Sequence, residues 1–598
     1  MTNICKTFNA GAVGVALWTA FLLGNLNSRA DAQVRQQAAD HPLVQALSAD
    51  VWRKEHRIID VHQHIENKPE RLARAIKILD GAGVGTGVLL GAGTVSKKGD
   101  QPSEFQAAKE QADRLHPGRF MCHMLLDYTG WDDASWSERA VKQIDDGYRL
   151  GAAGLKEFKR LGLVLKDGQG NLIRIDDEKL DPVWHRCGEL DMPVSIHVGD
   201  PAAFWLPYDS TNERWTELRD HKSWWFGDPK LYPPRMELLD ALNRVIERHP
   251  KTKFVCVHFA NNPEDLKWVE EALDSHPNMY ADMAARIPEL GRHEPEQVRR
   301  LFKKHQDRIL FATDFMVYNK CILGSGGDSD NPTDEQAIEF FMKCFRWLET
   351  DDRNWAHMTP IQGEWTISSI NLPPKVCRKI YFDNAQRIFA RSIPLPTLHA
   401  SKLDTDFLPD GKLEESVWQK AVPVRLEYES QSGIARPELS TSVKALWSDK
   451  YLYLSYECPY REINVFSPKT SQERLGLWDN DVVEAFIGSE PGVIKRYTEF
   501  EWAPSGEYLD LKLDLPAKDF EWTAAPDSSV VIDESAKVWR VETRIPLAAL
   551  SEHSPQVGDR WKINLYRHDR ADNAFMAMSP TLRGSFHTPE RFGWLKFD

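Results

Sequence analysis

Between residues 58 and 318 the chain alternates short apolar runs with longer amphipathic segments, and this alternation constrains the fold more than any other feature. Eight runs have the length and the β-branched content of buried strands: residues 58–65, 85–91, 119–127, 152–159, 193–200, 253–260, 278–286 and 308–315. Intervening segments such as 69–83 place apolar residues at i, i+3, i+4 and i+7, as amphipathic helices do. Eight strands, each followed by a helix, predict an α/β fold of the closed (β/α)8 TIM-barrel type. An open doubly wound sheet is the alternative.

A second domain is expected, because 598 residues exceed what one hydrophobic core organises. The barrel is predicted over residues 55–393, and residues 394–404, in a stretch rich in proline and small polar residues, are predicted to be a linker. Beyond it, runs such as 441–447 and 451–457 are short and alternate apolar with polar residues. They predict an antiparallel β-sandwich over residues 405–598.

The first residues have the features of an export signal. Lys6 precedes an apolar stretch from Ala10 to Leu23, and a small-x-small sequence ends at Ala32. We expect a signal peptide over residues 1–32, cleavage after Ala32 and a periplasmic or extracellular protein. An uncleaved anchor is the alternative, but about 14 apolar residues are fewer than the roughly 20 that a membrane span requires. No later segment is long and apolar enough to span, so no membrane association is expected after cleavage.

Composition excludes one class of partner and leaves two questions open. The formal charge of -14 includes no run of Lys and Arg that could follow a phosphate backbone, so nucleic acid is not an expected partner. Without Cys5 of the leader, seven of the eight cysteines remain, and their spacing argues against a disulfide framework, although one disulfide is allowed. The 21 tryptophans either pack cores or stack on sugar rings.

The first strand candidate, "IIDVHQHI", contains two histidines one residue apart. Side chains alternate along a strand, so His62 and His64 project to one face together with Asp60. A single histidine in a buried strand is usually a core residue with satisfied hydrogen bonds. Two on one face leave a structural and a metal-binding interpretation about equally supported.

Three later strand candidates favour the metal. His197, His258 and Asp314 lie at or near the ends of the fifth, sixth and eighth runs. The carboxyl ends of barrel strands meet on one face, where catalytic groups gather. Imidazoles and a carboxylate converging there predict a site for a divalent metal, with zinc preferred and manganese or iron as alternatives.

These residues, across positions 55–393, resemble the amidohydrolase superfamily, specifically its type 2 group of metal-dependent hydrolases. The resemblance implies hydrolysis of a lactone, ester or amide bond in a small-molecule or glycan-derived substrate, with non-oxidative decarboxylation as an alternative. It also implies that Asp314 transfers the proton of the attacking water, and that His258 is a ligand of a second metal or a donor to the substrate carbonyl. The implied metal ligands are His62, His64, His197, His258 and Asp314.

The number of metal ions depends on the fourth strand candidate. Some members of the superfamily place a carboxylated lysine there to bridge two ions, and Lys156 is the best match. Glu157 or Lys159 could take its place, since alternation does not say which side faces inward. A buried lysine paired with a carboxylate is the other interpretation, so one or two ions remain open.

A long insertion at residues 201–234 follows the fifth strand candidate. It carries Trp205, Trp215, Trp224 and Trp225, which either roof the pocket or pack the loop itself.

The C-terminal part, residues 405–598, resembles the family 9 carbohydrate-binding modules. The resemblance implies that Trp478 and Phe586 clamp a sugar ring, that Glu484 hydrogen-bonds to it, and that polysaccharide is a partner. The arginine that this family carries nearby is replaced by Glu501. A sandwich that has lost its ligand, or that binds the barrel, is one alternative. A secreted carbohydrate-binding protein of carbohydrate catabolism, with an inactive barrel, is another.

Overall fold

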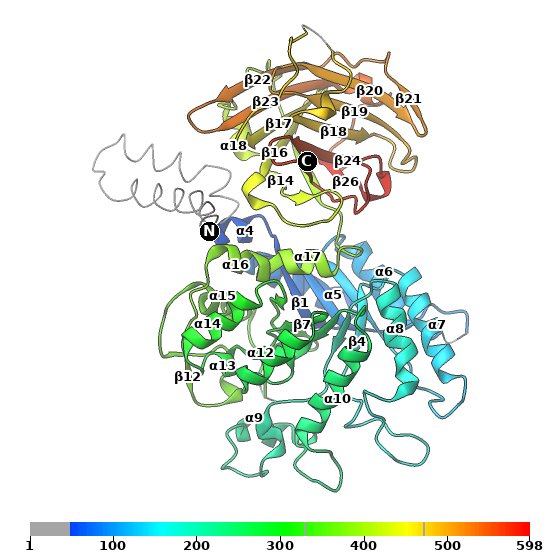
Figure 1. Ribbon diagram of the computed structural model, residues 1–598, viewed down its shortest axis with the longest axis vertical. Helices are drawn as coiled ribbons and strands as arrows, with labels where there is room; N and C mark the ends of the chain where they lie inside the picture. The colour runs from blue at the N-terminus through cyan, green and yellow to red at the C-terminus, as the bar shows by residue number, and fades with distance from the viewer. Residues whose placement is uncertain (1–47, 98, 328–329, 471–472) are drawn as a thin grey trace, which may run out of the picture. The chain divides into compact units, whose positions relative to one another are not determined.

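The chain consists of two compact units (Figure 1). The computed structural model describes residues 48–97, 99–327, 330–470 and 473–598. The first unit runs from Ala49 to Pro396, and the second includes Thr397–Asp598. The predicted signal peptide, residues 1–32, lies outside the described residues. Among those described, no helix is both long and apolar enough to cross a membrane.

The first unit is the predicted barrel. Its strands pair in parallel with their neighbours from β1 to β8. They are β1 (Ile58–Ile65), β2 (Val84–Thr94), β3 (Phe120–Leu125), β4 (Gly154–Glu157), β5 (Val194–Ile196), β6 (Phe254–Cys256), β7 (Met279–Asp282) and β8 (Ile309–Leu310).

The eighth predicted strand is interrupted, and its second part closes the barrel. After β8 the chain leaves the ladder and resumes as β9 (Phe315–Val317), which pairs in parallel with β1. Between the two parts, Val61 N–H donates to the Phe311 carbonyl at 3.1 Å and Asp314 N–H donates to the His62 carbonyl at 3.0 Å. The sheet therefore returns to its first strand, which excludes the open doubly wound alternative. A hairpin strand, β10 (Cys321–Leu323), extends β9.

The helices of the first unit surround its strands (Figure 1). In α5, Leu72, Ile78 and Leu79 form the buried face that the sequence period predicts, and burying each contributes about 1.5–3 kcal/mol. Gly83 ends this helix in the left-handed conformation that glycine adopts without a Cβ clash. The main helices are α5 (Pro69–Ala82), α6 (Glu104–Leu115), α7 (Trp136–Arg149), α8 (Asp181–Glu189), α10 (Arg235–Arg248), α12 (Leu266–Ser275), α14 (Pro295–Lys304) and α15 (Asp334–Glu349).

The second unit is a mainly antiparallel β-sandwich. Side chains of β16, β17 and β23 share one hydrophobic core with side chains of β18, β19 and β24, so the sheet folds into two layers. The main strands are β16 (Thr441–Trp447), β17 (Tyr451–Pro459), β18 (Val482–Gly488), β19 (Arg496–Trp502), β20 (Tyr508–Asp514), β23 (Val538–Pro546), β24 (Arg560–Asp569) and β26 (Gly593–Phe597).

The predicted linker at residues 394–404 is wrong over most of its length. Thr397–Lys402 forms β13, which pairs in parallel with both β26 and β16. Leu398 and Ala400 belong to the sandwich core. The prolines that suggested a linker precede this strand, and the apolar alternation after them is that of an interior strand.

Tryptophan and cysteine have mostly structural roles. The seven cysteines of the described residues are all buried and free, so none forms a disulfide among them. Trp478 differs from the buried tryptophans, because its side chain is 41% exposed. Eight tryptophans in the described part of the chain are fully buried: Trp52, Trp136, Trp184, Trp347, Trp418, Trp447, Trp502 and Trp539.

Candidate functional site

Ligand atoms from three barrel strands meet at the carboxyl ends of the strands. The side chains of His62, His258 and Asp314 each place one nitrogen or oxygen within 4.8 Å of the others. His62 Nε2 lies 3.2 Å from His64 Nε2. Asp314 Oδ1 lies 3.5 Å from the first of these nitrogens and 3.4 Å from the second. The structure thus brings together four of the predicted residues.

The far nitrogen of each imidazole is held by an acceptor. His64 Nδ1 lies 2.8 Å from the Leu90 carbonyl, and His258 Nδ1 lies 2.9 Å from the Ala284 carbonyl. A carbonyl only accepts, so each Nδ1 carries the proton. Burial lowers the pKa of both rings, to about 3 for His64, so they are neutral. Their Nε2 atoms therefore present lone pairs to the site.

His62 is oriented in the same way by a carboxylate. Its Nδ1 lies 2.9 Å from Asp282 Oδ2. The other oxygen, Asp282 Oδ1, accepts the N–H groups of His258 and Ala284 at 2.8 and 3.2 Å. A buried carboxylate that holds the far side of a metal-binding histidine is a recurrent arrangement. Asp282 lies within the seventh predicted strand, residues 278–286, and no local sequence pattern assigns it this role.

The facing lone pairs fit a metal ion. Three acceptor atoms separated by 3.2–3.5 Å repel one another unless a cation lies among them. Nitrogen and oxygen ligands about 2.0–2.2 Å from one tetrahedral ion lie about 3.4 Å apart. Asp314 Oδ1 is buried and accepts no hydrogen bond among the described residues. The residues therefore fit a divalent ion by both spacing and chemistry.

The backbone at this face is unusual where the ligands lie. His258, Phe259 and Asp314 have φ values of 54°, 53° and 61°, in the left-handed region that residues other than glycine seldom adopt. At Asp314 this conformation accompanies the break between β8 and β9. Such backbone strain persists where the surrounding structure over-determines it, and it concentrates at functional sites.

Asp60 has a structural role. Its carboxylate accepts the Thr313 hydroxyl at 2.5 Å, the Gln63 amide at 2.9 Å and two backbone N–H groups, those of His62 and Thr313. These bonds tie β1 to the segment before Asp314. Asp60 therefore fixes the backbone that carries His62 and Asp314. Both of its oxygens already accept two hydrogen bonds, which leaves none for a metal ion.

His197 lies beside the cluster with a different orientation. Its ring centroid is 4.4 Å from that of His258, but its Nε2 lies 3.1 Å from the Gly199 carbonyl and 3.3 Å from Asp200 Oδ1. As a ligand it would use Nδ1. Asp200 also pairs with Lys159. Burial would raise the pKa of Asp200, but Lys159 and His197 together outweigh it and hold the pKa well below its usual range.

The fourth strand presents Lys156 to the cavity. Lys156 Nζ is buried without a hydrogen-bond partner among the described residues, and burial lowers its pKa to about 8. Glu157 points elsewhere and accepts from the Tyr128 hydroxyl at 2.7 Å and from Arg160 at 3.1 Å. Alternation left the inward residue open, and the structure turns Glu157 away; Lys156 and Lys159 both line the cavity, but Lys159 pairs with Asp200 whereas Lys156 has no such partner among the described residues.

The insertion after β5 both lines the cavity and packs on itself. Trp224 and Phe204 line the cavity and stack with their rings 6.3 Å apart. Trp205 packs on Phe226 instead, while Trp215 and Trp225 pack on Tyr208. The cavity measures about 430 Å³. Residues that the sequence analysis did not single out also line it, namely His221, Met316, Tyr318, Lys320 and Ile322.

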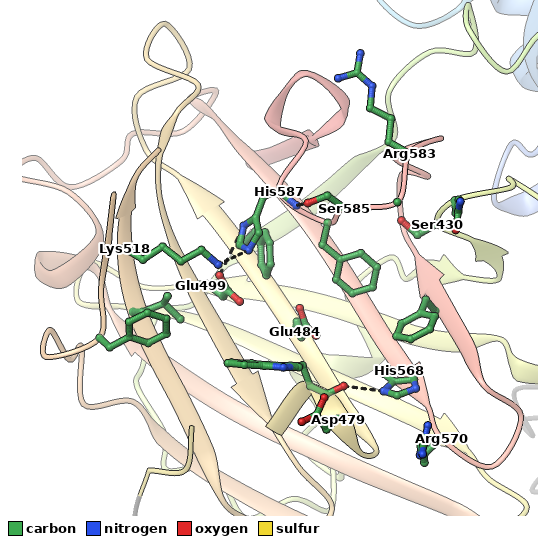
Figure 2. A pocket seen from close by; sticks show the side chains of 18 residues that line it. Ser430, Asp479, Glu484, Glu499, Lys518, His568, Arg570, Arg583, Ser585 and His587 are labelled. Atoms are coloured by element: carbon green, nitrogen blue, oxygen red, sulfur yellow. Dashed lines mark hydrogen bonds and ion pairs between the residues drawn. The ribbon is translucent and has the colours of Figure 1, made fainter. Parts of the chain in front are cut away.

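A second cavity, of about 580 Å³, lies in the sandwich (Figure 2). It brings together Trp478, Glu484 and Phe586, the three residues for which a sugar-binding role is predicted. Phe586 stacks in parallel on Tyr566 with the ring centroids 4.0 Å apart. The Trp478 carbonyl is held by His568 Nδ1 at 2.8 Å. A firmly positioned aromatic ring can stack on a ligand at little entropic cost.

Comparison with known proteins identifies the first unit. The sequence model of the family described as Amidohydrolase matches residues 59–391, which is more than half of the chain. The chain belongs to the amidohydrolase family. The model described as Carbohydrate family 9 binding domain-like matches residues 409–598. In this amidohydrolase the barrel is therefore followed along the chain by a domain of the family 9 carbohydrate-binding type, as both resemblances indicated.

Individual relatives of this amidohydrolase are distant. A protein of Arthroderma benhamiae described as an extracellular protein is 23% identical over an alignment of 180 residues that covers 27% of this chain and 80% of that protein. A family 9 carbohydrate-binding module from Caldicellulosiruptor kristjanssonii, in complex with glucose, is 16% identical with a TM-score of 0.26, covering 34% of this chain and 96% of the module. The 2,6-dihydroxybenzoate decarboxylase from Rhizobium is 16% identical with a TM-score of 0.31, covering 56% of this chain and 99% of the enzyme.

Proposed function

We propose that the barrel is a metal-dependent hydrolase that cleaves a lactone, ester or amide bond. The observation that carries the proposal is the convergence of His62 Nε2, His64 Nε2 and Asp314 Oδ1 to within 3.2–3.5 Å of one another. Each histidine is fixed from behind by an acceptor. Such a set is built to hold a cation, and zinc, manganese and iron all accept nitrogen and oxygen ligands.

The chemistry divides between the ion and Asp314. A divalent ion supplies Lewis acidity, which lowers the pKa of a bound water and polarises a carbonyl. Asp314 is a buried carboxyl group beside His62 Nε2 and His64 Nε2, so it lies within reach of a water that an ion between them would hold. A carboxylate within hydrogen-bond reach of such a water can act as its general base. Asp314 therefore takes the proton from the attacking water and returns it to the leaving group.

His258 serves better as a ligand than as an acid. Its Nδ1–H is committed to the Ala284 carbonyl, so its Nε2 could donate a proton only if the ring were charged. Burial, with the nearby charges of His197 and Arg286, holds the pKa of His258 well below its usual range. A neutral imidazole supplies a lone pair and no proton from Nε2.

Whether the site holds one metal ion or two depends on whether Lys156 is a ligand. The convergent atoms of His62, His64 and Asp314 account for one ion. A second would need Lys156 as a carboxylated ligand. Metal analysis of Lys156→Met, with the wild type alongside, separates the cases: a drop from two ions to one supports the binuclear site, and one ion in both supports the mononuclear site.

We also propose that the sandwich binds carbohydrate. The whole protein is proposed to be exported. Trp478, Glu484 and Phe586 share one cavity in a domain of carbohydrate-binding type. The predicted leader, residues 1–32, and the similarity to a fungal extracellular protein support export to the periplasm or beyond. A polysaccharide bound by the sandwich would then keep the barrel near its substrate.

A substrate panel tests the enzymatic proposal. Esters, lactones, amides and carboxylated aromatic rings are incubated with the metal-loaded wild type, with Asp314→Asn and with a matched control, Asp240→Asn, whose carboxylate is exposed on α10. Hydrolysis lost only in Asp314→Asn supports the proposal. Carbon dioxide release without hydrolysis would replace it with decarboxylation, and no turnover of any substrate would favour a binding protein with an inactive barrel.

A further inference from the structure

Three glutamates share one face of the sandwich sheet beneath its cavity. Glu484 on β18 pairs directly with Glu501 on β19, and Glu499 lies two residues away on the same face. Their exposed fractions are 3%, 0% and 5%. Glu484 and Glu499 line the cavity. A buried anion is costly unless a cation or several donors accompany it.

These carboxyl groups lack such partners. Within the part of the chain that the structure describes, both oxygens of Glu501 and Oε2 of Glu499 are buried and accept no hydrogen bond. No lysine or arginine of that part forms an ion pair with any of the three, and His587 Nδ1 approaches Glu499 only to 3.9 Å. Burial accordingly raises the pKa of Glu499 to about 7.

The cations that border the cavity point to other groups. Lys518 Nζ lies 2.6 Å from His587 Nε2, and Figure 2 shows its side chain directed there. Arg583 points away from the cavity, and Arg570 lies beside Asp479 and His568 (Figure 2). Lys518 lies near enough to lower the pKa of all three glutamates but forms no ion pair with any of them, so one lysine faces three buried acidic groups at this acidic floor of the cavity.

Aromatic rings form the other walls. Trp478 is exposed to the cavity, Phe586 stacks on Tyr566, and Phe575 stacks on His568 with the centroids 4.2 Å apart. The faces of aromatic rings attract both the C–H groups of a sugar and a positive charge. At about 580 Å³ the cavity has the size of a small-ligand site.

We propose that this cavity selects a cationic amino sugar, of the kind found in β-1,4-linked glucosamine oligomers, over neutral sugars of the same shape. The inference rests on the proposed carbohydrate-binding role of the sandwich. The ammonium group supplies the cation that Glu484 and Glu499 lack, while the pyranose ring stacks on Trp478 and Phe586. The replacement of the family's arginine by Glu501 removes a positive charge from the site, in the same sense.

Three trisaccharides of matched length test the selectivity. Binding of the full chain to glucosamine trimer, cellotriose and N-acetylglucosamine trimer is measured by calorimetry at pH 7, close to the pKa of about 7 of Glu499, so that a carboxylate can form beside an ammonium group. We expect the glucosamine trimer to bind at least tenfold more tightly than the other two. Equal or weaker binding overturns the inference but leaves the carbohydrate-binding role intact if cellotriose binds. Binding of none of the three overturns both.

Isosteric variants assign the selectivity to the acidic floor. Glu499→Gln is expected to lower the affinity for glucosamine trimer about tenfold and to leave cellotriose unchanged, while the exposed Glu490→Gln changes neither. If Glu499→Gln folds poorly, Glu484→Gln is measured in its place, with the same selective loss of glucosamine trimer affinity expected. An equal loss for both sugars, or no loss for either, would overturn the assignment.

Discussion

The barrel site and the sandwich cavity both bury carboxyl groups that form no ion pair with a lysine or arginine of the described residues, yet they surround them differently. In the barrel, Asp314 faces imidazole lone pairs at 3.4–3.5 Å. In the sandwich, Glu499 lies on an open sheet face among aromatic rings. Burial raises the pKa of both to about 7. Burying the carboxyl group is thus unfavourable in both places. Lone pairs that converge on one point suit a metal ion, whereas acidic groups spread over a flat sheet face suit a larger organic cation.

Replacing Asp314 with Asn should have the largest effect on the barrel. The amide cannot accept the proton of the attacking water, so kcat should fall by about 10²- to 10⁴-fold with little change in stability. Steady-state kinetics on a responsive ester or lactone, with circular dichroism as a folding check, measure this. A loss of less than about tenfold would remove Asp314 from the proton-transfer role.

The next largest effect is expected on metal affinity, from replacing Asp282, whose carboxylate holds His62 Nδ1. Asp282→Asn replaces the carboxylate at His62 Nδ1 with an amide, so we expect the affinity for the metal to fall by about 10- to 100-fold. Competition with a chelator measures the change. Unaltered affinity would mean that Asp282 serves only the fold, through the His258 and Ala284 N–H groups.

Removing the exposed indole of Trp478 in the sandwich should weaken glycan binding and leave the activity of the barrel on a soluble substrate unchanged. Trp478→Ala is expected to lose about tenfold in affinity, because one stacking contact contributes about 0.5–1.5 kcal/mol beyond its buried area. Trp478→Phe keeps a ring and should retain most of the binding. Coupled loss of barrel activity on a soluble substrate would show that the two sites are not separate.

The smallest effect is a pH dependence of stability in the sandwich. Burial raises the pKa of Glu499 from 4.5 to about 7. Between these values the unfolded chain has released the proton that the folded chain keeps, so the free energy of unfolding falls as the pH rises from about 4.5 to 7. Below 4.5 both states are protonated, and this contribution is fully present.

Glu499→Gln removes that titration. Thermal unfolding at pH 4.5 and pH 7 should therefore show a smaller difference in the variant than in the wild type. Equal differences in the two proteins would mean that Glu499 titrates normally.

The spacing of apolar residues and the residue types at strand ends predicted most of the barrel and most of its site. The eight strands and the convergence of His62, His64, His258 and Asp314 followed from alternation and from the geometry of parallel strands. The orientation of His197 did not, because ring direction depends on Gly199 and Asp200, which compete for the same nitrogen. The inward direction of Lys156 needed the barrel register.

Long-range contacts account for the remaining gaps. Asp282 lies 220 residues from the histidine that it supports, and no local pattern links the two. Strand β13 was missed since its partners β16 and β26 lie far along the chain. The acidic floor depends on the pairing of Glu484 with Glu501, which only sheet register reveals.

The most direct test of the barrel account is the metal content of the purified full chain. Plasma mass spectrometry should find at least one divalent ion per chain in the wild type and in Asp240→Asn, and less than a tenth of that in a folded His62→Ala, His64→Ala double variant. A wild type without stoichiometric metal, or a double variant that keeps it, would contradict the account.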